Sequence, residues 1–236
     1  MLDNGLVPAS EETTSGVVDL DLSDIKPGLT ISIATDGGAS GCGGKIWPAG
    51  ELLVKYILFK EQQIRSVLSA SGTRPLVLEL GSGTGISGLA VGKLGCADVW
   101  ITDQAQMVDL MHQNIVLNNL EDIVHAKELN WGEPLPNEIV KRPPAIVLAA
   151  DCVYLEPAFP LLEKTLEDLA ALNEECLILM AYKKRRKADA KYFKLARKHF
   201  ILEEISDFPE YEQYKKDSVR LYRFHLKKRS GTLKTE

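Results

Sequence analysis

The stretch that most constrains this chain runs from Leu76 to Gly85, where an apolar run leads straight into three glycines at alternate positions. Apolar residues then recur at helical spacing from Ile86, so the pattern predicts a strand over 76–80, a tight turn and a helix. Glycines let the backbone approach a ligand closely, and free N–H groups at a helix start can hold a polar or anionic group. The stretch therefore predicts a cofactor-binding turn, with a glycine turn that binds no ligand as the alternative.

Two cofactor classes fit these glycines. Gly83, Gly85 and Gly88 match the G-x-G-x-x-G pattern of dinucleotide-binding folds, and Asp103 follows Gly83 by twenty residues. In such a fold the first glycine of the match should end the strand, whereas here Gly81 already does so. The longer string, Glu-Leu-Gly-x-Gly-x-Gly, resembles motif I of the S-adenosylmethionine-dependent methyltransferases. That resemblance implies that the strand-end acid helps to fix the turn and the cofactor.

Composition restricts the class of protein. The 236 residues are 45% hydrophobic and 26% charged, as expected of a globular chain large enough for one well-buried domain. No apolar run approaches the roughly 18 residues of a membrane span, and residues 1–15 lack the pattern of a signal peptide. The four cysteines are scattered and the four histidines isolated, so no metal site is expected. We expect a monomer in a reducing compartment, cytosol or nucleus, with the cytoplasm preferred.

Strand and helix patterns alternate along the chain. Strands are expected at 17–22, 29–33, 76–80, 98–102, 123–127, 145–150, 176–182, 200–205 and 218–226, and helices at 48–60, 86–94, 107–117, 157–172 and 188–199. Crossovers of this length predict an α/β fold with a doubly wound, mostly parallel, seven-stranded Rossmann-like sheet. The closing strand pair has no expected helix between its members, which predicts an antiparallel strand at that edge.

These patterns predict one domain over 16–228. It would comprise an N-terminal β-hairpin and helix over 16–70 and a core over 74–228. A disordered leader over 1–15 would precede it, and a flexible tail over 229–236 would follow.

Ligands of an open α/β sheet bind beyond the carboxyl ends of its strands, where the strand order reverses. Polar or aromatic residues follow four of the expected strands: Glu79 with the glycines, then Asp103, then Trp131, then Asp151 with Tyr154. Taken singly, Asp103 also fits a helix N-cap and Trp131 a core tryptophan, and Trp47 beside a glycine loop is equally ambiguous. Four such strand ends at one sheet edge favour a ligand site.

Four segments narrow the resemblance to a family. Residues 44–50 (Gly-Lys-Ile-Trp-Pro-Ala-Gly), 78–85, 129–132 (Leu-Asn-Trp-Gly) and 150–154 (Ala-Asp-Cys-Val-Tyr) look like the seven-β-strand protein-lysine methyltransferases of the methyltransferase-like 21 group. That group modifies chaperones and translation elongation factors, and the similarity covers residues 17–226. It implies an S-adenosyl-L-methionine pocket lined by Trp47, Glu79, Gly81, Ser82, Gly83, Asp103, Trp131 and Ala150. It also implies that Asp151 and Tyr154 face the substrate lysine.

The chemistry of lysine methylation agrees with these two roles. A lysine amine with a reference pKa near 10.4 is mostly protonated at neutral pH and cannot attack while charged. A nearby sulfonium would lower that pKa and Asp151 would raise it, so Asp151 fits an orienting acceptor better than a base. Tyr154 can hydrogen-bond the amine and offer its π face to a cation. Asp-Cys-Val-Tyr also lacks the two prolines of the related Asn/Asp-Pro-Pro-Tyr motif, which favours lysine over an amide or a nucleobase.

A basic segment stands out in an acidic chain. Residues 183–198 carry nine Lys and Arg against one acid, although the net charge is −5. A solvated face is one interpretation, and substrate docking through Lys183, Lys184, Arg185 and Arg186 is the other. Residues 181–186 (Ala-Tyr-Lys-Lys-Arg-Arg) most resemble fungal enzymes that act on translation elongation factor 1-alpha, which implies that factor as partner.

Four alternatives stay open. They are a nicotinamide-dependent oxidoreductase, a non-catalytic S-adenosylmethionine-binding scaffold, a methyltransferase acting on another protein such as a chaperone, and an RNA methyltransferase. The overall acidity argues against a broad nucleic-acid footprint.

Overall fold

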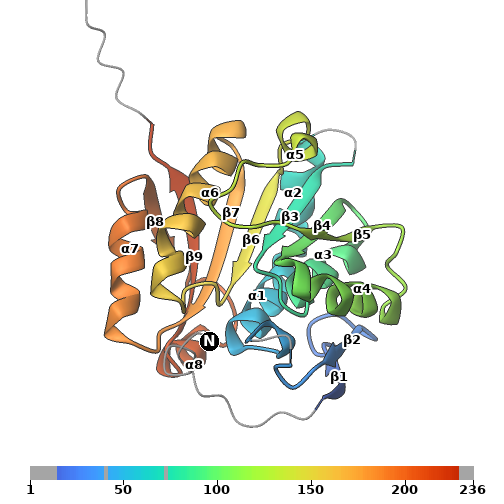
Figure 1. The fold of residues 1–236 in the computed structure, drawn as a ribbon. Coiled ribbons are helices and arrows are strands. Elements are labelled where there is room, and N and C mark those ends of the chain that lie inside the picture. The colour runs from blue at the N-terminus through green and yellow to red at the C-terminus, as the bar shows by residue number, and fades with distance from the viewer. Residues whose placement is uncertain (1–14, 40–41, 72–73, 229–236) are drawn as a thin grey trace, which may run out of the picture.

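A computed structural model describes residues 15–39, 42–71 and 74–228. Its centre is a seven-stranded sheet (Figure 1). In spatial order the strands are β5 (Val124–Glu128), β4 (Asp98–Asp103), β3 (Leu76–Leu80), β6 (Ile146–Ala150), β7 (Leu177–Lys183), β9 (Val219–Leu226) and β8 (Phe200–Glu204). Residues 1–14 of the expected leader over 1–15, and the whole expected tail over 229–236, lie outside the described residues.

The first five strands of that order run parallel, whereas β9 runs antiparallel to both β7 and β8. The predicted doubly wound, mostly parallel sheet with an antiparallel edge is therefore confirmed, with β9 one position in from the outermost strand. The chain leaves β3 toward β4 on one side and later returns to β6 on the other. This reversal beside β3 is where an open α/β sheet places its ligand.

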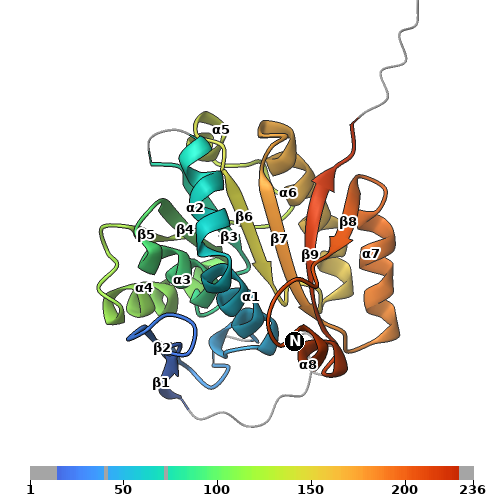
Figure 2. The same cartoon turned by 180° about the vertical axis from the view of Figure 1, so that it is seen from behind.

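Successive residues of the central strands face opposite sides of the sheet. Val77 and Leu148 pack with α1 (Pro48–Phe59), α2 (Glu61–Ala70), α3 (Ile86–Leu94) and α4 (Val108–Leu117). Figure 2 shows α1 and α2 in front of the sheet. Leu78 and Val147 pack on the other side with α5 (Asn137–Lys141), α6 (Phe159–Leu172) and α7 (Ala190–Ala196). Burial on both faces explains why β3 and β6 are apolar along almost their whole length.

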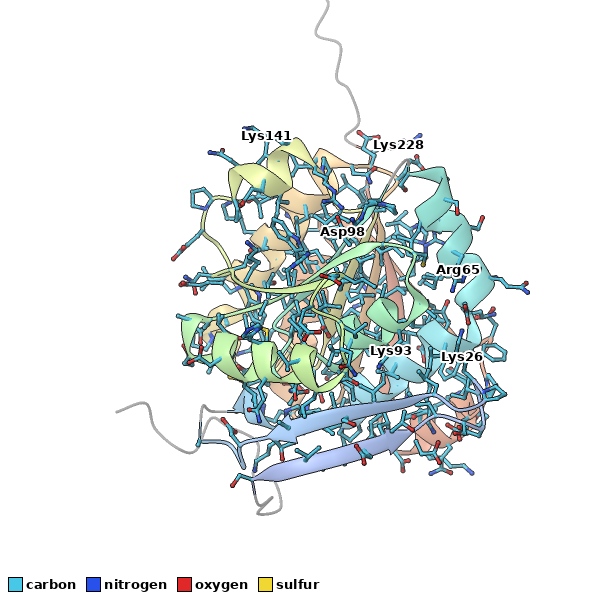
Figure 3. The ribbon with its side chains drawn as sticks, turned by 90° about the vertical axis from the view of Figure 1, so that its right-hand side faces the viewer. Lys26, Arg65, Lys93, Asp98, Lys141 and Lys228 are labelled. Atoms are coloured by element: carbon cyan, nitrogen blue, oxygen red, sulfur yellow. The ribbon has the colours of Figure 1, made fainter. Side chains whose placement is uncertain are left out.

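A separate two-stranded hairpin, β1 (Gly16–Asp21) and β2 (Thr30–Thr35), lies beside α4. Fully buried Asn114 accepts a hydrogen bond from the backbone N–H of Ala34 at 2.6 Å and donates to the carbonyls of Ala34 and Thr84 at 3.2 and 2.9 Å. An ion pair of 2.6 Å joins Lys26 in the turn of the hairpin to Glu61 of α2. Figure 3 labels Lys26 beside the turn. One asparagine thus joins the hairpin to the glycine turn after β3.

Two short helices depart from the sequence-based expectations. α5 has five residues and α8 (Tyr211–Lys216) has six, too few to show a helical period. The expectation that no helix separates the closing strands is therefore wrong, because α8 lies between β8 and β9. Among the described residues, no helix is both long and apolar enough to cross a membrane.

Candidate active site

A cavity of about 580 Å³ opens at the carboxyl edge of β3, β4 and β6. This volume lies within the roughly 300–1,000 Å³ range of sites for cofactor-sized ligands. All ten residues expected at the site line the cavity: Trp47, Glu79, Gly81, Ser82, Gly83, Asp103, Trp131, Ala150, Asp151 and Tyr154. The convergence follows from the topology, because the carboxyl ends of parallel strands meet at one edge.

The glycine turn needs its glycines for both backbone conformation and space. Gly81, Gly83 and Gly85 have φ angles of 57°, 55° and 81°, in the left-handed region that side-chain-bearing residues rarely adopt. A Cβ at Gly81 would lie 2.7 Å from Cζ2 of Trp131, and one at Gly83 would lie 2.7 Å from the carbonyl oxygen of Gly43. The turn is therefore packed between the tryptophan and the loop before α1.

The buried carboxylate of Glu79 stabilises this turn. Its carboxylate is almost fully buried and accepts a hydrogen bond of 2.9 Å from the backbone N–H of Gly88 in α3. Burial raises the pKa of Glu79 to about 7, although the Gly88 N–H opposes the rise. Ser82 ties the turn to the next strand, because its hydroxyl accepts from the N–H of Thr102 at 2.8 Å and donates to the carbonyl of Glu79 at 3.1 Å.

Asp103 ends β4 and lies beside the glycine turn at the edge of the cavity. Its Oδ2 accepts the backbone N–H of Gly83 at 2.8 Å, and its Oδ1 accepts that of Gln104 at 2.7 Å. The residue before the next helical turn is Gln104, so Asp103 does not serve as its N-cap. Burial raises the pKa of Asp103, and the two backbone N–H groups limit that rise. Each carboxylate oxygen keeps a free lone pair for a further donor in the cavity.

Two tryptophans form walls of the cavity. Trp131 lies against Gly81, lines the cavity and also packs against the apolar core beneath α6. It is therefore both a core residue and part of the cavity wall. Trp47 precedes α1, and its Nε1–H donates to the carbonyl of Cys42 at 2.9 Å. The guanidinium carbon of Arg185 lies 5.0 Å from the centre of the Trp47 ring, a cation–π distance.

Asp151 follows β6 with a φ angle of 56°, a strained conformation for a residue with a side chain. Both of its carboxylate oxygens accept hydrogen bonds of 2.8 Å from the two terminal nitrogens of Arg185. Its Oδ1 also accepts the backbone N–H of Lys183 at 3.0 Å. The expected acceptor for a lysine is thus already paired with an arginine inside the cavity.

Tyr154 lies three residues further along and is half-buried in the cavity wall. Burial raises the pKa of its phenol well above the usual range, so the group remains a neutral hydrogen-bond donor. Its backbone carbonyl accepts a hydrogen bond from Arg186. Arg185 and Arg186 therefore hold the loop that carries Asp151 and Tyr154.

The basic segment folds around one buried acid. The carboxylate of Asp189 is 1% exposed and accepts the backbone N–H groups of Arg185 and Arg186 at 3.1 and 3.0 Å and the hydroxyl of Tyr182 at 3.2 Å. Of the four residues expected to dock a partner, Lys184 is exposed, whereas Arg185 points into the cavity. Sequence reasoning missed Arg185 and Asp189 as site residues, and the one acid among nine basic residues was the available signal.

Comparisons with known proteins identify a family and relatives of this chain. A family model described as lysine methyltransferase matches residues 25–199. Protein-lysine N-methyltransferase EFM6 of Saccharomyces cerevisiae is 46% identical over 207 residues, which cover 81% of this chain and 84% of that protein. Protein N-lysine methyltransferase METTL21A of Danio rerio is 27% identical over 206 residues, covering 86% and 87%.

Solved structures share the fold. The METTL16 MTase domain superposes with a TM-score of 0.51 at 11% identity, covering 78% of this chain and 71% of that one. The CMeT domain of the citrinin polyketide synthase gives 0.51 at 14% identity, covering 74% and 52%. At these identities the likeness concerns the fold alone.

Proposed function

The chain belongs to the lysine methyltransferase family, and we propose that the cavity beyond β3, β4 and β6 is where it methylates a lysine side chain of a protein. The methyl donor of this family is S-adenosylmethionine, which brings its own activated methyl on a sulfonium. The protein then has to bind the donor, admit the lysine and align the two. One observation carries the proposal: the glycine turn with Asp103 and the pair Asp151 and Tyr154 line a single cavity.

The residues beside β3 and β4 fit the donor. The Asp103 carboxylate retains acceptor capacity for ribose hydroxyls while the Gly83 N–H fixes its orientation. The turn from Gly81 to Gly83 has no Cβ to keep a ligand away from its backbone. Trp131 offers a flat apolar surface beside the turn, and we assign it to the adenine end. Trp47, Glu79, Ser82 and Ala150 complete the donor half in this proposal.

The residues beyond β6 fit the lysine. The Tyr154 hydroxyl oxygen can accept a hydrogen bond from an N–H of the amine, which leaves the amine lone pair free to attack the methyl, and its ring can face a cation. Asp151 lies beside it and, through Arg185, fixes the wall facing Trp47. We propose that Tyr154 orients the amine and that Asp151 shapes the end of the lysine channel.

We propose translation elongation factor 1-alpha as the protein substrate and the cytoplasm as the place of reaction. Support comes from residues 181–186, which resemble fungal enzymes acting on that factor and comprise the end of β7 and the residues after it, with Arg185 at the cavity. Exposed Lys184 and Lys187 would add positive charge to the docking rim. Charges on a rim act mainly through association rate and salt dependence.

The donor half is tested by titrating S-adenosylmethionine calorimetrically into Asp103→Ala. We expect at least about a tenfold loss of affinity, since two backbone N–H groups and the ribose hydroxyls lose their acceptor. Asp98→Ala is the matched control, because Asp98 lies at the opposite end of the same strand and pairs with Arg74 and Arg142 instead. Unchanged affinity in Asp103→Ala would remove Asp103 from the site.

The substrate is tested by incubating the protein and labelled S-adenosylmethionine with purified, unmethylated elongation factor 1-alpha. We expect a labelled lysine in that protein. Label that appears only in a chaperone, or only in RNA, when whole-cell extract replaces the factor would assign the activity to that substrate instead.

A further inference from the structure

We infer that Arg185 is the counter-ion of Asp151 in the cavity: it cancels the charge of the carboxylate so that the cavity does not hold lysine as an ammonium ion. This role deepens the proposed function and depends on its placement of Asp151 at the lysine end. Arg185 would then be a positioning residue for the reaction, although it lies in a segment whose charge suggests an exposed surface.

The geometry of the pair is that of a fixed ion pair. The two terminal nitrogens of Arg185 donate to the two oxygens of Asp151 at 2.8 Å each, a bidentate contact. The side chains are 16% and 4% exposed, so neither is a freely solvated surface group. Arg185 is held from two further sides, by the ring of Trp47 at 5.0 Å and, through its backbone N–H, by Asp189 at 3.1 Å.

Pairing Asp151 with Arg185 would favour the reactive, neutral form of the substrate lysine. A carboxylate within about 4–6 Å of a lysine raises the pKa of the amine by roughly 1–3 units and favours the unreactive ammonium form. An arginine stays protonated throughout the working pH range, so Arg185 neutralises the charge of Asp151 at every pH in that range. The paired carboxylate keeps its steric and hydrogen-bonding role in the wall while its net charge is cancelled.

Other titratable groups line the cavity from the neighbouring elements: Cys42 and Lys45 before α1, Glu79 on β3, Asp103 on β4, Glu133 after β5, and Cys152 and Tyr154 after β6. Two more residues contact the ion pair through hydrogen bonds: Lys183 at the end of β7, whose backbone N–H donates to Asp151, and Asp189, which accepts the backbone N–H of Arg185. Glu79 and Asp103 are hydrogen-bonded within the glycine turn, and Asp189 within the basic segment. The carboxylate at the end of β6 is the one that Arg185 neutralises.

A binding experiment tests the charge role without any protein substrate. S-adenosylmethionine carries a sulfonium, whereas S-adenosylhomocysteine has a neutral sulfur and the same remaining groups. In Arg185→Gln the unpaired Asp151 should favour the sulfonium, shifting the ratio of the two affinities toward S-adenosylmethionine by about tenfold. Asp151→Asn should shift the ratio the opposite way, because Arg185 is then unopposed. Arg185→Lys should stay near the wild-type ratio, since it keeps the charge.

Arg197→Gln is the matched control, because Arg197 is exposed, directly follows α7 and does not line the cavity. Circular dichroism checks that each variant is folded. If Arg185→Gln lowers the affinity for both ligands equally, the inference is wrong. Arg185 would then bind the carboxylate that S-adenosylmethionine and S-adenosylhomocysteine both carry. An unchanged ratio in Arg185→Gln would overturn it as well.

The pH dependence of single-turnover methylation of elongation factor 1-alpha gives a second readout. Arg185→Gln should move the rise of the rate about 1 pH unit or more to the alkaline side, and Asp151→Asn should move it to the acid side. A purely structural arginine would lower the rate without moving the profile. If wild-type protein does not methylate the factor at all, the proposed substrate fails, and the affinity ratio still decides the role of Arg185.

Discussion

Replacing Gly83 with alanine probes the closeness of the glycine turn to the loop before α1. The φ angle of 55° costs an alanine about 1–2 kcal/mol. The new Cβ would lie 2.7 Å from the carbonyl oxygen of Gly43, whereas ordinary van der Waals contact begins at 3.4 Å. The loop must therefore retreat by several tenths of an ångström, or the overpacking adds about 1–3 kcal/mol.

Gly95→Ala separates the two contributions. Gly95 ends α3 with a φ angle of 67°, and a Cβ there meets nothing within 4 Å. This control should lose only the conformational part of the free energy of unfolding, about 1–2 kcal/mol, and should bind S-adenosylmethionine as the wild type does. Gly83→Ala should lose about 2–5 kcal/mol, or bind the donor at least about tenfold more weakly if the loop yields instead.

Urea unfolding and calorimetric titration of both variants give the two quantities. Equal destabilisation of Gly83→Ala and Gly95→Ala together with wild-type donor affinity would contradict a close contact between the turn and the loop. The turn would then tolerate a side chain, and the contact with Gly43 would not shape the donor site.

Three further predictions follow from the buried polar groups. Because Glu79 keeps its proton in the folded state up to about pH 7 but loses it near 4.5 when unfolded, its contribution to the stability of the ligand-free protein should fall by about 3 kcal/mol as pH rises through that window; urea unfolding at several pH values should show the wild type losing about that much more stability than Glu79→Gln. Asn114→Ala should lower the free energy of unfolding by about 2–4 kcal/mol, since backbone groups of Ala34 and Thr84 lose their partner, and an effect below about 1 kcal/mol would contradict the anchoring role. Tyr154→Phe should bind S-adenosylmethionine within about twofold of the wild type yet lower kcat about ten- to a hundredfold, and an unchanged kcat would exclude the phenol from aligning the amine.

Much of the fold follows from the sequence because its signals are local and strong. The strand over 76–80 and the helix over 86–94 have the bounds expected of them, since one is wholly buried and the other lies between two glycines, Gly85 and Gly95. α5 and α8 were not predicted, because one or two turns of helix show no periodicity and depend on tertiary contacts.

Part of the candidate site could likewise be predicted from the sequence, and part could not. Its strand-end residues could be predicted, because parallel topology brings strand ends together whatever the loops do. The pairing of Asp151 with Arg185 could not, because it joins two loops 34 residues apart and reverses the usual interpretation of a basic run as a solvated face. Only the folded position of Asp189, which turns the segment back on itself, places that arginine in the cavity.

The central claim, that this cavity transfers a methyl group from S-adenosylmethionine to a lysine of a protein, is tested most directly by mapping the transferred methyl. Unmethylated elongation factor 1-alpha is incubated with the protein and methyl-labelled S-adenosylmethionine, and the labelled residue is identified by tandem mass spectrometry. We expect label on a lysine side chain with wild-type protein and with Asp98→Ala, and its loss with Asp103→Ala. Label on another residue type, or equal labelling by Asp103→Ala, would contradict it.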